Sequence, residues 1–277
     1  MTYKELYTKY KTEALNLGLE DSAIKLLITE LSNFSFTEFY LNFDKKVPEE
    51  RLKKIANAIN KYLLEKVPVQ YILGYTYFYG LKLNVNKSVL IPRRETEELV
   101  DYVINENKIT KPKILDIGTG SGAIAIALKA NIESNVTAVD ISDAALEVAK
   151  ENARKNNLEI NFIKSDIFEN VKGRYDIIVS NPPYIAKEEI VAELVYLNEP
   201  HLALYAEADG LYYYDKILKE AKHYLEHRNM LVFEIPENKD EKLIGLVKTY
   251  YKDSDFEILK DLQAKSRILV IKNNWRW

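Results

Sequence analysis

The chain contains no cysteine among its 277 residues, and it has only three histidines. Without cysteine there are no disulfides, no thiolate metal ligands and no cysteine nucleophile. The histidines, His201, His223 and His227, are scattered and lack the spacing of metal ligands. We therefore expect neither a metal centre nor cysteine-based catalysis.

Long apolar runs are absent as well. No stretch reaches the roughly 18 consecutive apolar residues that a membrane-spanning helix needs, and the N-terminal residues are charged throughout, without an apolar leader segment. Acidic residues outnumber basic ones, 42 to 39, which gives a net charge of -3, whereas non-specific nucleic-acid binders are more often basic. We expect a cytoplasmic monomer that associates with no membrane and binds no nucleic acid stably.

The N-terminal region has the pattern of a small helical bundle. Apolar side chains recur at helical spacing, as at Leu6 and Tyr10. Ser35 is placed to cap a short helix, and Pro48 lies at the start of a longer one. No catalytic group stands out, so the bundle is either a folding appendage or a module that docks a substrate. We assign residues 1–74 to an N-terminal substrate-docking domain.

The rest of the chain predicts an α/β fold. Residues 75–90 alternate apolar and polar side chains around Gly80, which predicts a β-hairpin that links two domains. From residue 112 onward, predicted strands and helices alternate, which implies a doubly wound, mostly parallel sheet. The last two strands have no helix between them and therefore predict an antiparallel edge. We assign residues 91–277 to this second domain.

A glycine-rich segment follows the first predicted strand of the sheet, Lys113–Ile117. Its glycines let the backbone turn tightly and approach a ligand without intervening side chains. The spacing G-x-G-x-G differs from the G-x-G-x-x-G of dinucleotide sites, which favours a ligand without a pyrophosphate. The residues of this segment are Gly118, Thr119, Gly120, Ser121 and Gly122.

Three acidic residues are placed to complete a nucleoside site. Asp116 precedes the glycines and can accept a hydrogen bond from an ammonium group or a water. Asp140 ends the next predicted strand, where a carboxylate can bind both hydroxyls of a ribose. Asp166 follows the third strand, where it can meet an adenine amino group while Ile167 packs on the ring. This set favours S-adenosyl-L-methionine over NAD as the cofactor.

The fourth predicted strand, Tyr175–Ser180, runs directly into Asn181, Pro182, Pro183 and Tyr184. Its carboxyl end is expected to open into the ligand crevice of such a sheet. The Asn181 side-chain oxygen and the Pro182 carbonyl can each accept one N–H of a planar NH2 group, whose lone pair is delocalised. The prolines restrict φ and remove competing donors, and Tyr184 can stack on the planar group. The pattern predicts methyl transfer to such a nitrogen, with positioning supplying much of the rate.

Other interpretations of these residues remain open. Two prolines after a buried strand also occur in a plain turn. A DNA or RNA amino-methyltransferase acting on adenine N6 or cytosine N4 would share Asn181–Tyr184, but it should also carry a basic target-recognition region or base-flipping loops. A non-enzymatic scaffold that kept the fold would be expected to lose the asparagine or the glycines. The acidic chain argues against a nucleic-acid substrate, and the retained asparagine and glycines favour an enzyme over a scaffold.

A wider resemblance spans almost the whole chain. The chain resembles the peptide-chain release factor glutamine N5-methyltransferase family in Pro68–Gly74, Leu90–Glu97 and Asn181–Tyr184. The first two segments are the specific ones, because Asn-Pro-Pro-Tyr is shared with nucleic-acid amino-methyltransferases. The pair Glu199–Pro200 and the triplet Asp209–Leu211 match a later segment of the family.

The resemblance implies a small helical domain on a seven-stranded class I methyltransferase core that uses S-adenosyl-L-methionine. The implied acceptor is the glutamine of the Gly-Gly-Gln loop in class 1 peptide-chain release factors, which places the enzyme in translation termination. The residues implied in cofactor binding are Gly118, Thr119, Gly120, Ser121, Gly122, Asp140, Ile167 and Asn181. Those implied in glutamine binding are Asn181, Pro182, Pro183 and Tyr184, with Asn181, Pro182 and Tyr184 taking part in catalysis.

Ile167 and Pro236 are among the positions that depart from the pattern of that family. Ile167 stands where an aromatic residue is common, which predicts weaker packing on the adenine. Pro236 stands where a glycine is usual, and it fixes φ where glycine would leave the backbone free. Both changes concern the shape of loops rather than the chemistry.

Overall fold

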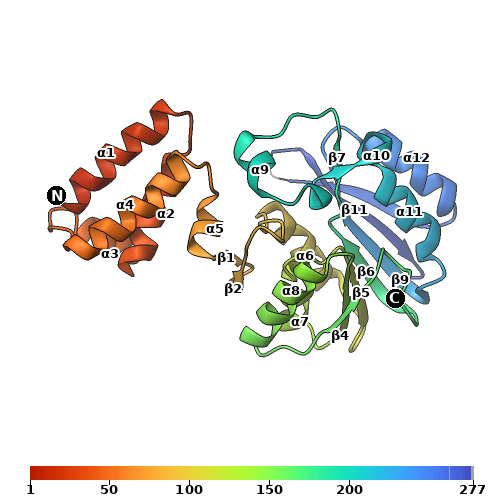
Figure 1. Ribbon diagram of the computed structural model, residues 1–277. Helices are drawn as coiled ribbons and strands as arrows, with labels where there is room; N and C mark the ends of the chain where they lie inside the picture. Colours follow the sequence, from red (N-terminus) through yellow and green to blue (C-terminus); the bar gives the residue numbers. More distant parts are fainter. Residues whose placement is uncertain (262, 276–277) are drawn as a thin grey trace. The chain divides into compact units, whose positions relative to one another are not determined.

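The computed structural model describes residues 1–261 and 263–275 (Figure 1). The chain divides into two compact units, which we call the helical unit and the sheet unit. The helical unit comprises residues 1–75 and 191–198, and the sheet unit comprises the described residues of 76–190 and 199–277. Within the described ranges, no helix combines the length and the apolar character needed to cross a bilayer.

The helical unit is an all-α bundle around an apolar core. Leu6, Phe39 and Ile55 are fully buried in it. Ser35 caps its helix as expected: the Ser35 hydroxyl accepts from the Glu38 N–H, while the Glu38 carboxylate accepts from the Ser35 N–H. The helices of this unit are α1 (Tyr3–Asn16), α2 (Asp21–Ser32), α3 (Phe36–Leu41), α4 (Glu49–Leu63), α5 (Val69–Leu73) and α9 (Glu193–Asn198).

Two features of this unit were not predicted from the sequence. Val69–Leu73 forms a short helix, and Gly74 ends it in the left-handed region, with a φ of 81°. Helix α9 comes from much later in the chain, yet it packs here. Leu194 is partly buried against the core, and Asn198 Nδ2 donates to the Lys66 carbonyl oxygen at 2.6 Å. The expected boundaries left this segment in the second domain.

Seven strands of the described chain form one mixed sheet in the sheet unit, in the order β10-β11-β9-β6-β3-β4-β5. Strands β9, β6, β3, β4 and β5 are parallel, whereas β11 is antiparallel to β9 and β10 is antiparallel to β11. The expected doubly wound sheet with an antiparallel edge is therefore confirmed. The strands are β3 (Lys113–Ile117), β4 (Asn135–Asp140), β5 (Asn161–Lys164), β6 (Tyr175–Ser180), β9 (Leu225–Glu234), β10 (Asp255–Lys260) and β11 (Ser266–Asn273).

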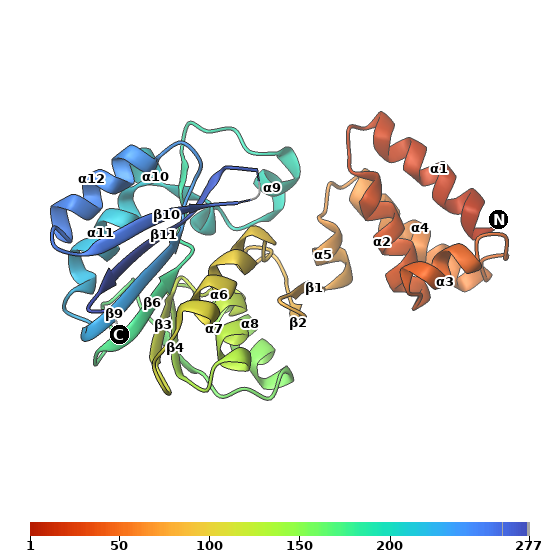
Figure 2. The same ribbon diagram turned by 180° about the vertical axis from the view of Figure 1, so that it is seen from behind.

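Helices cover both faces of this sheet (Figures 1 and 2). Side chains of α6 and α7, such as Val100 and Ile126, share one buried core with the sheet, and side chains of α11 and α12, such as Ile217 and Leu243, share the other. Burial on both faces explains why the central strands are almost continuously apolar. The helices are α6 (Glu95–Glu106), α7 (Ala123–Asn131), α8 (Asp143–Lys155), α10 (Glu207–Gly210), α11 (Tyr212–Ala221) and α12 (Asp240–Tyr250), with a 3-10 turn, η1 (His201–Ala203).

The predicted hairpin consists of β1 (Tyr75–Phe78) and β2 (Leu81–Asn84), which form a two-stranded sheet. It is shorter than the predicted span to residue 90, because the chain leaves β2 in a loop that reaches the ligand pocket described below. Phe78 and Leu83 are buried in the core of the sheet unit. The hairpin therefore packs as part of that unit. A second short pair, β7 (Ile185–Ala186) with β8 (Tyr205–Ala206), follows the acceptor residues.

Candidate active site

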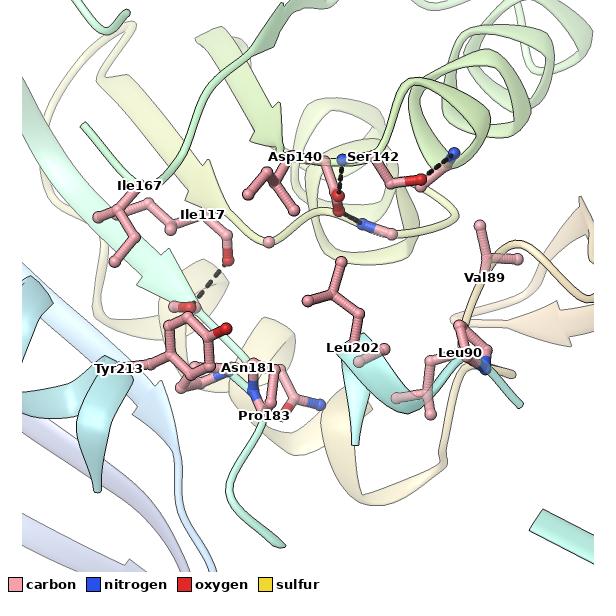
Figure 3. A pocket seen from close by; sticks show the side chains of 18 of the residues that line it. Val89, Leu90, Ile117, Asp140, Ser142, Ile167, Asn181, Pro183, Leu202 and Tyr213 are labelled. Carbon is pink, nitrogen blue, oxygen red and sulfur yellow. Dashed lines mark hydrogen bonds between the residues drawn. The ribbon is translucent and has the colours of Figure 1, made fainter. Parts of the chain in front are cut away.

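A pocket opens at the carboxyl ends of β3, β4 and β6, where the strand order reverses. Doubly wound sheets bind their ligands at such a switch point. The cavity, including its open mouth, holds about 890 Å³ of empty space. Figure 3 shows side chains from both predicted halves of the site around it. The expected site residues that line the pocket are Gly118, Gly120, Asp140, Ile167, Asn181, Pro182 and Pro183.

The glycines of the loop after β3 have two different roles. Gly118 and Gly120 line the pocket with φ values of 73° and 55°, in the left-handed region. A Cβ at either position would meet no heavy atom of the described chain within 4 Å, so the loop stays open to a ligand. A Cβ at Gly122 would instead lie 2.9 Å from Ile126 Cδ1 and 3.2 Å from Ala149 Cβ. Gly122 thus allows α7 to pack closely against α8.

Thr119, Ser121 and Gly122 do not line the pocket; they build the loop that does. The Thr119 hydroxyl donates to Asp116 Oδ2 at 2.6 Å, and the Ser121 carbonyl accepts from Asn152 Nδ2 at 2.9 Å. Both side chains are buried. Their contribution is to fix the backbone of the glycines that face the ligand.

Asp140 ends β4 with its carboxylate at the pocket. Its Oδ2 accepts from the Gly120 N–H at 2.8 Å, and its Oδ1 accepts from the Ser142 N–H at 2.9 Å (Figure 3). Burial raises the pKa of this carboxyl, and the backbone donors oppose that rise. A carboxylate oxygen has two lone pairs, so each Asp140 oxygen can still accept a second hydrogen bond. This arrangement suits a vicinal diol such as that of a ribose.

Asp116 lies directly behind the glycine loop and is fully buried. Its Oδ2 accepts from Thr119 and from the Ala125 N–H, whereas its Oδ1 has no hydrogen-bond partner among the described residues. Burial raises the pKa of Asp116 to about 7. A buried acceptor without a donor is costly, so this oxygen is suited to an ammonium group or a water at the loop.

The turn after β5 supplies the third part of the pocket wall. Ile167 lines the pocket in the left-handed region, with a φ of 51°, which is strained for a β-branched residue. The Ser165 hydroxyl holds the turn by donating to the Ile167 carbonyl and accepting from the Asn170 N–H, each at 3.0 Å. Asp166 also lines the pocket, and its carboxylate pairs with Lys216 Nζ at 2.9 Å.

The acceptor residues follow β6 and reach the same pocket. Asn181, Pro182 and Pro183 line it beside Ser180, whose hydroxyl donates to a β3 carbonyl oxygen at 2.8 Å (Figure 3). Tyr184 does not line the pocket but packs, partly buried, against the core below α11 and α12. Burial raises the pKa of its hydroxyl to about 12, so Tyr184 is a neutral phenol at physiological pH.

The turn at Tyr184 is supported by the segment that precedes α11. A Cβ at Gly210 would lie 2.1 Å from the Tyr184 carbonyl oxygen, and Gly210 has a φ of 77°. Lys239 Nζ donates to the Asp209 carbonyl oxygen at 2.8 Å and approaches the Tyr184 carbonyl oxygen at 3.5 Å. Only glycine therefore fits at position 210 without moving the acceptor turn.

Two residues whose roles sequence reasoning missed hold the Asn181 side chain. Asn181 Nδ2 donates to Thr96 Oγ1 at 3.2 Å, and the Thr96 hydroxyl donates to Glu234 Oε2 at 2.5 Å. Thr96 and Glu234 are 4% and 5% exposed. Burial raises the pKa of the Glu234 carboxyl to about 7, while the hydrogen bond from Thr96 and the nearby Asn181 side chain lower it.

Two further lining segments were also missed. One follows the hairpin and the other includes the turn η1, and both adjoin segments that carry the family resemblance. A buried carboxylate joins them, because Glu199 accepts from Arg93 Nη2 at 2.6 Å and from the Ile91 N–H at 3.1 Å. Their lining residues are Ser88, Val89, Leu90, Pro200, Leu202 and Ala203.

These observations fit S-adenosyl-L-methionine. The backbone at Gly118 and Gly120 leaves room for a methionine part, and the Asp116 oxygen, which has no partner among the described residues, is suited to a water that meets its ammonium group. Asp140 presents a carboxylate suited to ribose hydroxyls, and Ile167 presents an apolar side chain suited to an adenine.

Comparison with known proteins identifies the family. Residues 12–74 match the PrmC N-terminal domain and residues 96–204 match the methyltransferase small domain. The release factor glutamine methyltransferase of Streptococcus pneumoniae is 40% identical over 275 residues, which cover 98% of each chain. That of Bacillus subtilis is 35% identical over 95% of this chain and 93% of its own. The chain belongs to the release factor glutamine methyltransferase family.

Solved structures confirm the fold. A methyltransferase from Pyrococcus furiosus is 20% identical, with a TM-score of 0.53 over 81% of this chain and 98% of its own. A 16S rRNA N2 G1207 methyltransferase from T. thermophilus, solved with AdoMet and guanosine, is 16% identical, with a TM-score of 0.53 over 72% of this chain and 50% of its own. The predictions of this family, of a class I methyltransferase fold and of a methyltransferase enzyme are confirmed, and the family favours the protein-glutamine prediction over the nucleic-acid alternative.

Proposed function

We propose that this enzyme transfers the methyl group of S-adenosyl-L-methionine to the side-chain N5 of the glutamine in the Gly-Gly-Gln loop of class 1 peptide-chain release factors. One observation carries the proposal: Asn181, Pro182 and Pro183 line the same pocket as Gly118 and Asp140. The residues proposed for the methyl donor and for its acceptor thus line one cavity, and relatives of this chain are named release factor glutamine methyltransferase.

The acceptor end is suited to an amide nitrogen. The lone pair of a glutamine NH2 is delocalised, so the nitrogen attacks well only when it is held in line with the carbon that it receives. Asn181 Oδ1 and the Pro182 carbonyl oxygen can each accept one of its two N–H bonds. The pocket side of Pro183 offers no N–H that would compete for those oxygens. Fixing the reactants in this way can supply a large part of the rate.

The cofactor supplies a methyl group on a positively charged sulfur, which makes that carbon the electrophile. The chain contributes orientation at both ends of the pocket. Asp140 would hold the ribose, and the open backbone at Gly118 and Gly120 would leave room for the methyl donor in the pocket that Asn181 also lines. After transfer, the acidified nitrogen loses its proton to water or to a carbonyl oxygen, so no strong general base is required.

The partner is therefore a protein loop presented at the pocket mouth, and the helical unit is proposed as the module that docks the rest of that protein. Its match to the N-terminal domain of the same family supports this role. We further propose that the enzyme acts as a monomer in the cytoplasm. We also propose that it binds no nucleic acid stably, in keeping with its net charge of -3.

Mass spectrometry of the products tests the proposal. Purified class 1 release factors are incubated with the enzyme and cofactor, and parallel arms contain DNA or RNA instead. One added methyl on the loop glutamine is expected, with none on a release factor whose loop glutamine is replaced by alanine. Methylated nucleic acid together with unmodified release factor would overturn the proposal.

A further inference from the structure

The Asn181 amide carries an oxygen and a nitrogen with opposite hydrogen-bonding properties, and only the oxygen suits the proposed acceptor. Its Oδ1 can accept an N–H from a glutamine amide, whereas its Nδ2 presents donors that would oppose that N–H. A rotation of the amide by half a turn exchanges the two with little change in shape. Catalysis thus requires that something in the protein selects the orientation.

The structure contains a device for this selection. Asn181 Nδ2 donates to Thr96 Oγ1, and Thr96 Oγ1 donates to Glu234 Oε2. An ionised carboxylate only accepts hydrogen bonds, so the Thr96 hydroxyl must donate its single hydrogen to Glu234. Towards Asn181 the Thr96 oxygen can then act only as an acceptor. The negative charge of Glu234 therefore sets the direction of both hydrogen bonds. Within the described residues, Asn181 Oδ1 has no competing donor, and Asn181 lines the pocket.

We propose that Thr96 and Glu234 are positioning residues that orient the Asn181 amide, so that its oxygen faces the acceptor glutamine. The inference rests on the proposed function, since the required orientation follows from an N–H-bearing acceptor. Neither residue lines the pocket. Thr96 lies in the first turn of α6 and Glu234 ends β9, so the packing of this helix against the sheet brings the two side chains together.

The direction of these two hydrogen bonds also depends on pH. When Glu234 takes up a proton, it becomes able to donate to Thr96, whose hydroxyl is then free to donate to Asn181 and to stabilise the reversed amide. Burial raises the pKa of Glu234 to about 7, within the working range. The charged and titratable groups that face it are Glu95, Arg267, Tyr184 and Tyr214. Glu95 raises the pKa and Arg267 lowers it.

Kinetics at saturating cofactor and release factor provide the first test. We expect the wild-type kcat to fall about two- to tenfold as pH drops from 8 to 6, and we call this fall the pH limb. Glu234→Gln should remove the pH limb, because the amide that it introduces does not titrate. Thr96→Val should lower kcat about tenfold by leaving buried partners unpaired, and Thr96→Ser should restore it. The cofactor Kd should stay within about twofold in all three.

Matched variants control for general damage. Glu199→Gln changes another buried carboxylate of the same unit, one that binds Arg93 rather than Asn181, and it should keep the pH limb. A Glu234→Gln enzyme that retains both the wild-type kcat and the pH limb would overturn the inference. So would equal losses in Thr96→Ser and Thr96→Val.

A second measurement does not depend on activity. The side-chain NH2 signal of Asn181, assigned in nitrogen-15 spectra by its disappearance in Asn181→Ala, should titrate near pH 7 in the wild type and not in Glu234→Gln. An Asn181 signal that is independent of pH in both proteins would refute the device. If the wild type fails to methylate the glutamine at all, the proposed function fails, and these spectra decide the inference by themselves.

Discussion

The two ends of the switch-point pocket are built in different ways. The cofactor end consists mainly of backbone, with open glycines at Gly118 and Gly120 and a carboxylate, Asp140, only 20 residues from the N–H it binds. The acceptor end depends on side chains that are distant in sequence, because Thr96 lies 85 residues before Asn181 and 138 residues before Glu234.

This difference has a physical reason. The cofactor end must let a large ligand approach closely. This requires positions without side chains, where main-chain groups can contact the ligand. The acceptor end must hold one small amide in one orientation, and such control needs directional hydrogen bonds from groups fixed by the packed core. Damage at the two ends should therefore appear in different measurements, affinity at one and turnover at the other.

The largest expected effect is that of Asn181→Ala. Loss of one of two acceptors for the reacting amide should lower kcat by about 10²–10³-fold, while the cofactor Kd changes only a few-fold. A radiolabelled methyl assay and calorimetry measure the two quantities. Asn105→Ala, at an exposed position on α6, serves as the control and should match the wild type. If Asn181→Ala kept the wild-type kcat, turnover would not depend on the acceptor end, and the contrast between the two ends would fail.

Asp116 predicts a pH effect on stability at the cofactor end. Its folded pKa of about 7 exceeds the ordinary value of 3.8, so the folded protein binds this proton more tightly than the unfolded chain. The resulting stabilisation is complete below the ordinary value and is lost as pH rises through 7. The cofactor-free protein should lose up to about 4 kcal/mol from this group between pH 4 and pH 8.

Asp116→Asn removes the titration, so its free energy of unfolding should decline less over the same range. Urea denaturation at a series of pH values measures both slopes. Asp143→Asn, which changes an exposed carboxylate on α8, should keep the wild-type slope. Parallel curves for the wild type and Asp116→Asn would show that Asp116 is already ionised in the folded protein.

The same contrast explains what could be predicted from the sequence. The glycine loop and Asp140 are separated by a short strand-helix-strand unit, so their meeting follows from the spacing alone. Asn181 could be placed because it follows a predicted strand directly. Thr96 and Glu234 could not be assigned a role, since their encounter depends on how α6 packs against β9. The same holds for α9, whose packing in the helical unit leaves no local pattern.

Asp140→Asn should mainly weaken cofactor binding. The amide loses the negative charge, and one of its two polar atoms becomes a donor that opposes the Gly120 or Ser142 N–H. We expect the cofactor Kd to rise about 10–30-fold, with kcat at saturating cofactor changed far less. Calorimetry and saturation kinetics separate the two. A variant with normal affinity and reduced kcat would assign Asp140 to the acceptor end instead.

A pair of glycine substitutions, one of them with the smallest expected effect, distinguishes backbone strain from close packing at the acceptor end. Gly80 and Gly210 have similar φ values, 74° and 77°, but a Cβ at Gly80 would be in open space, whereas one at Gly210 would lie 2.1 Å from the Tyr184 carbonyl oxygen. Gly80→Ala should therefore show the left-handed strain alone, about 1 kcal/mol. Gly210→Ala should lose about 1–2 kcal/mol more and should also lower kcat, because the turn that carries Pro182 and Pro183 must move. If thermal unfolding and kinetics give the same losses for both variants, the contact at Tyr184 does not constrain the acceptor turn.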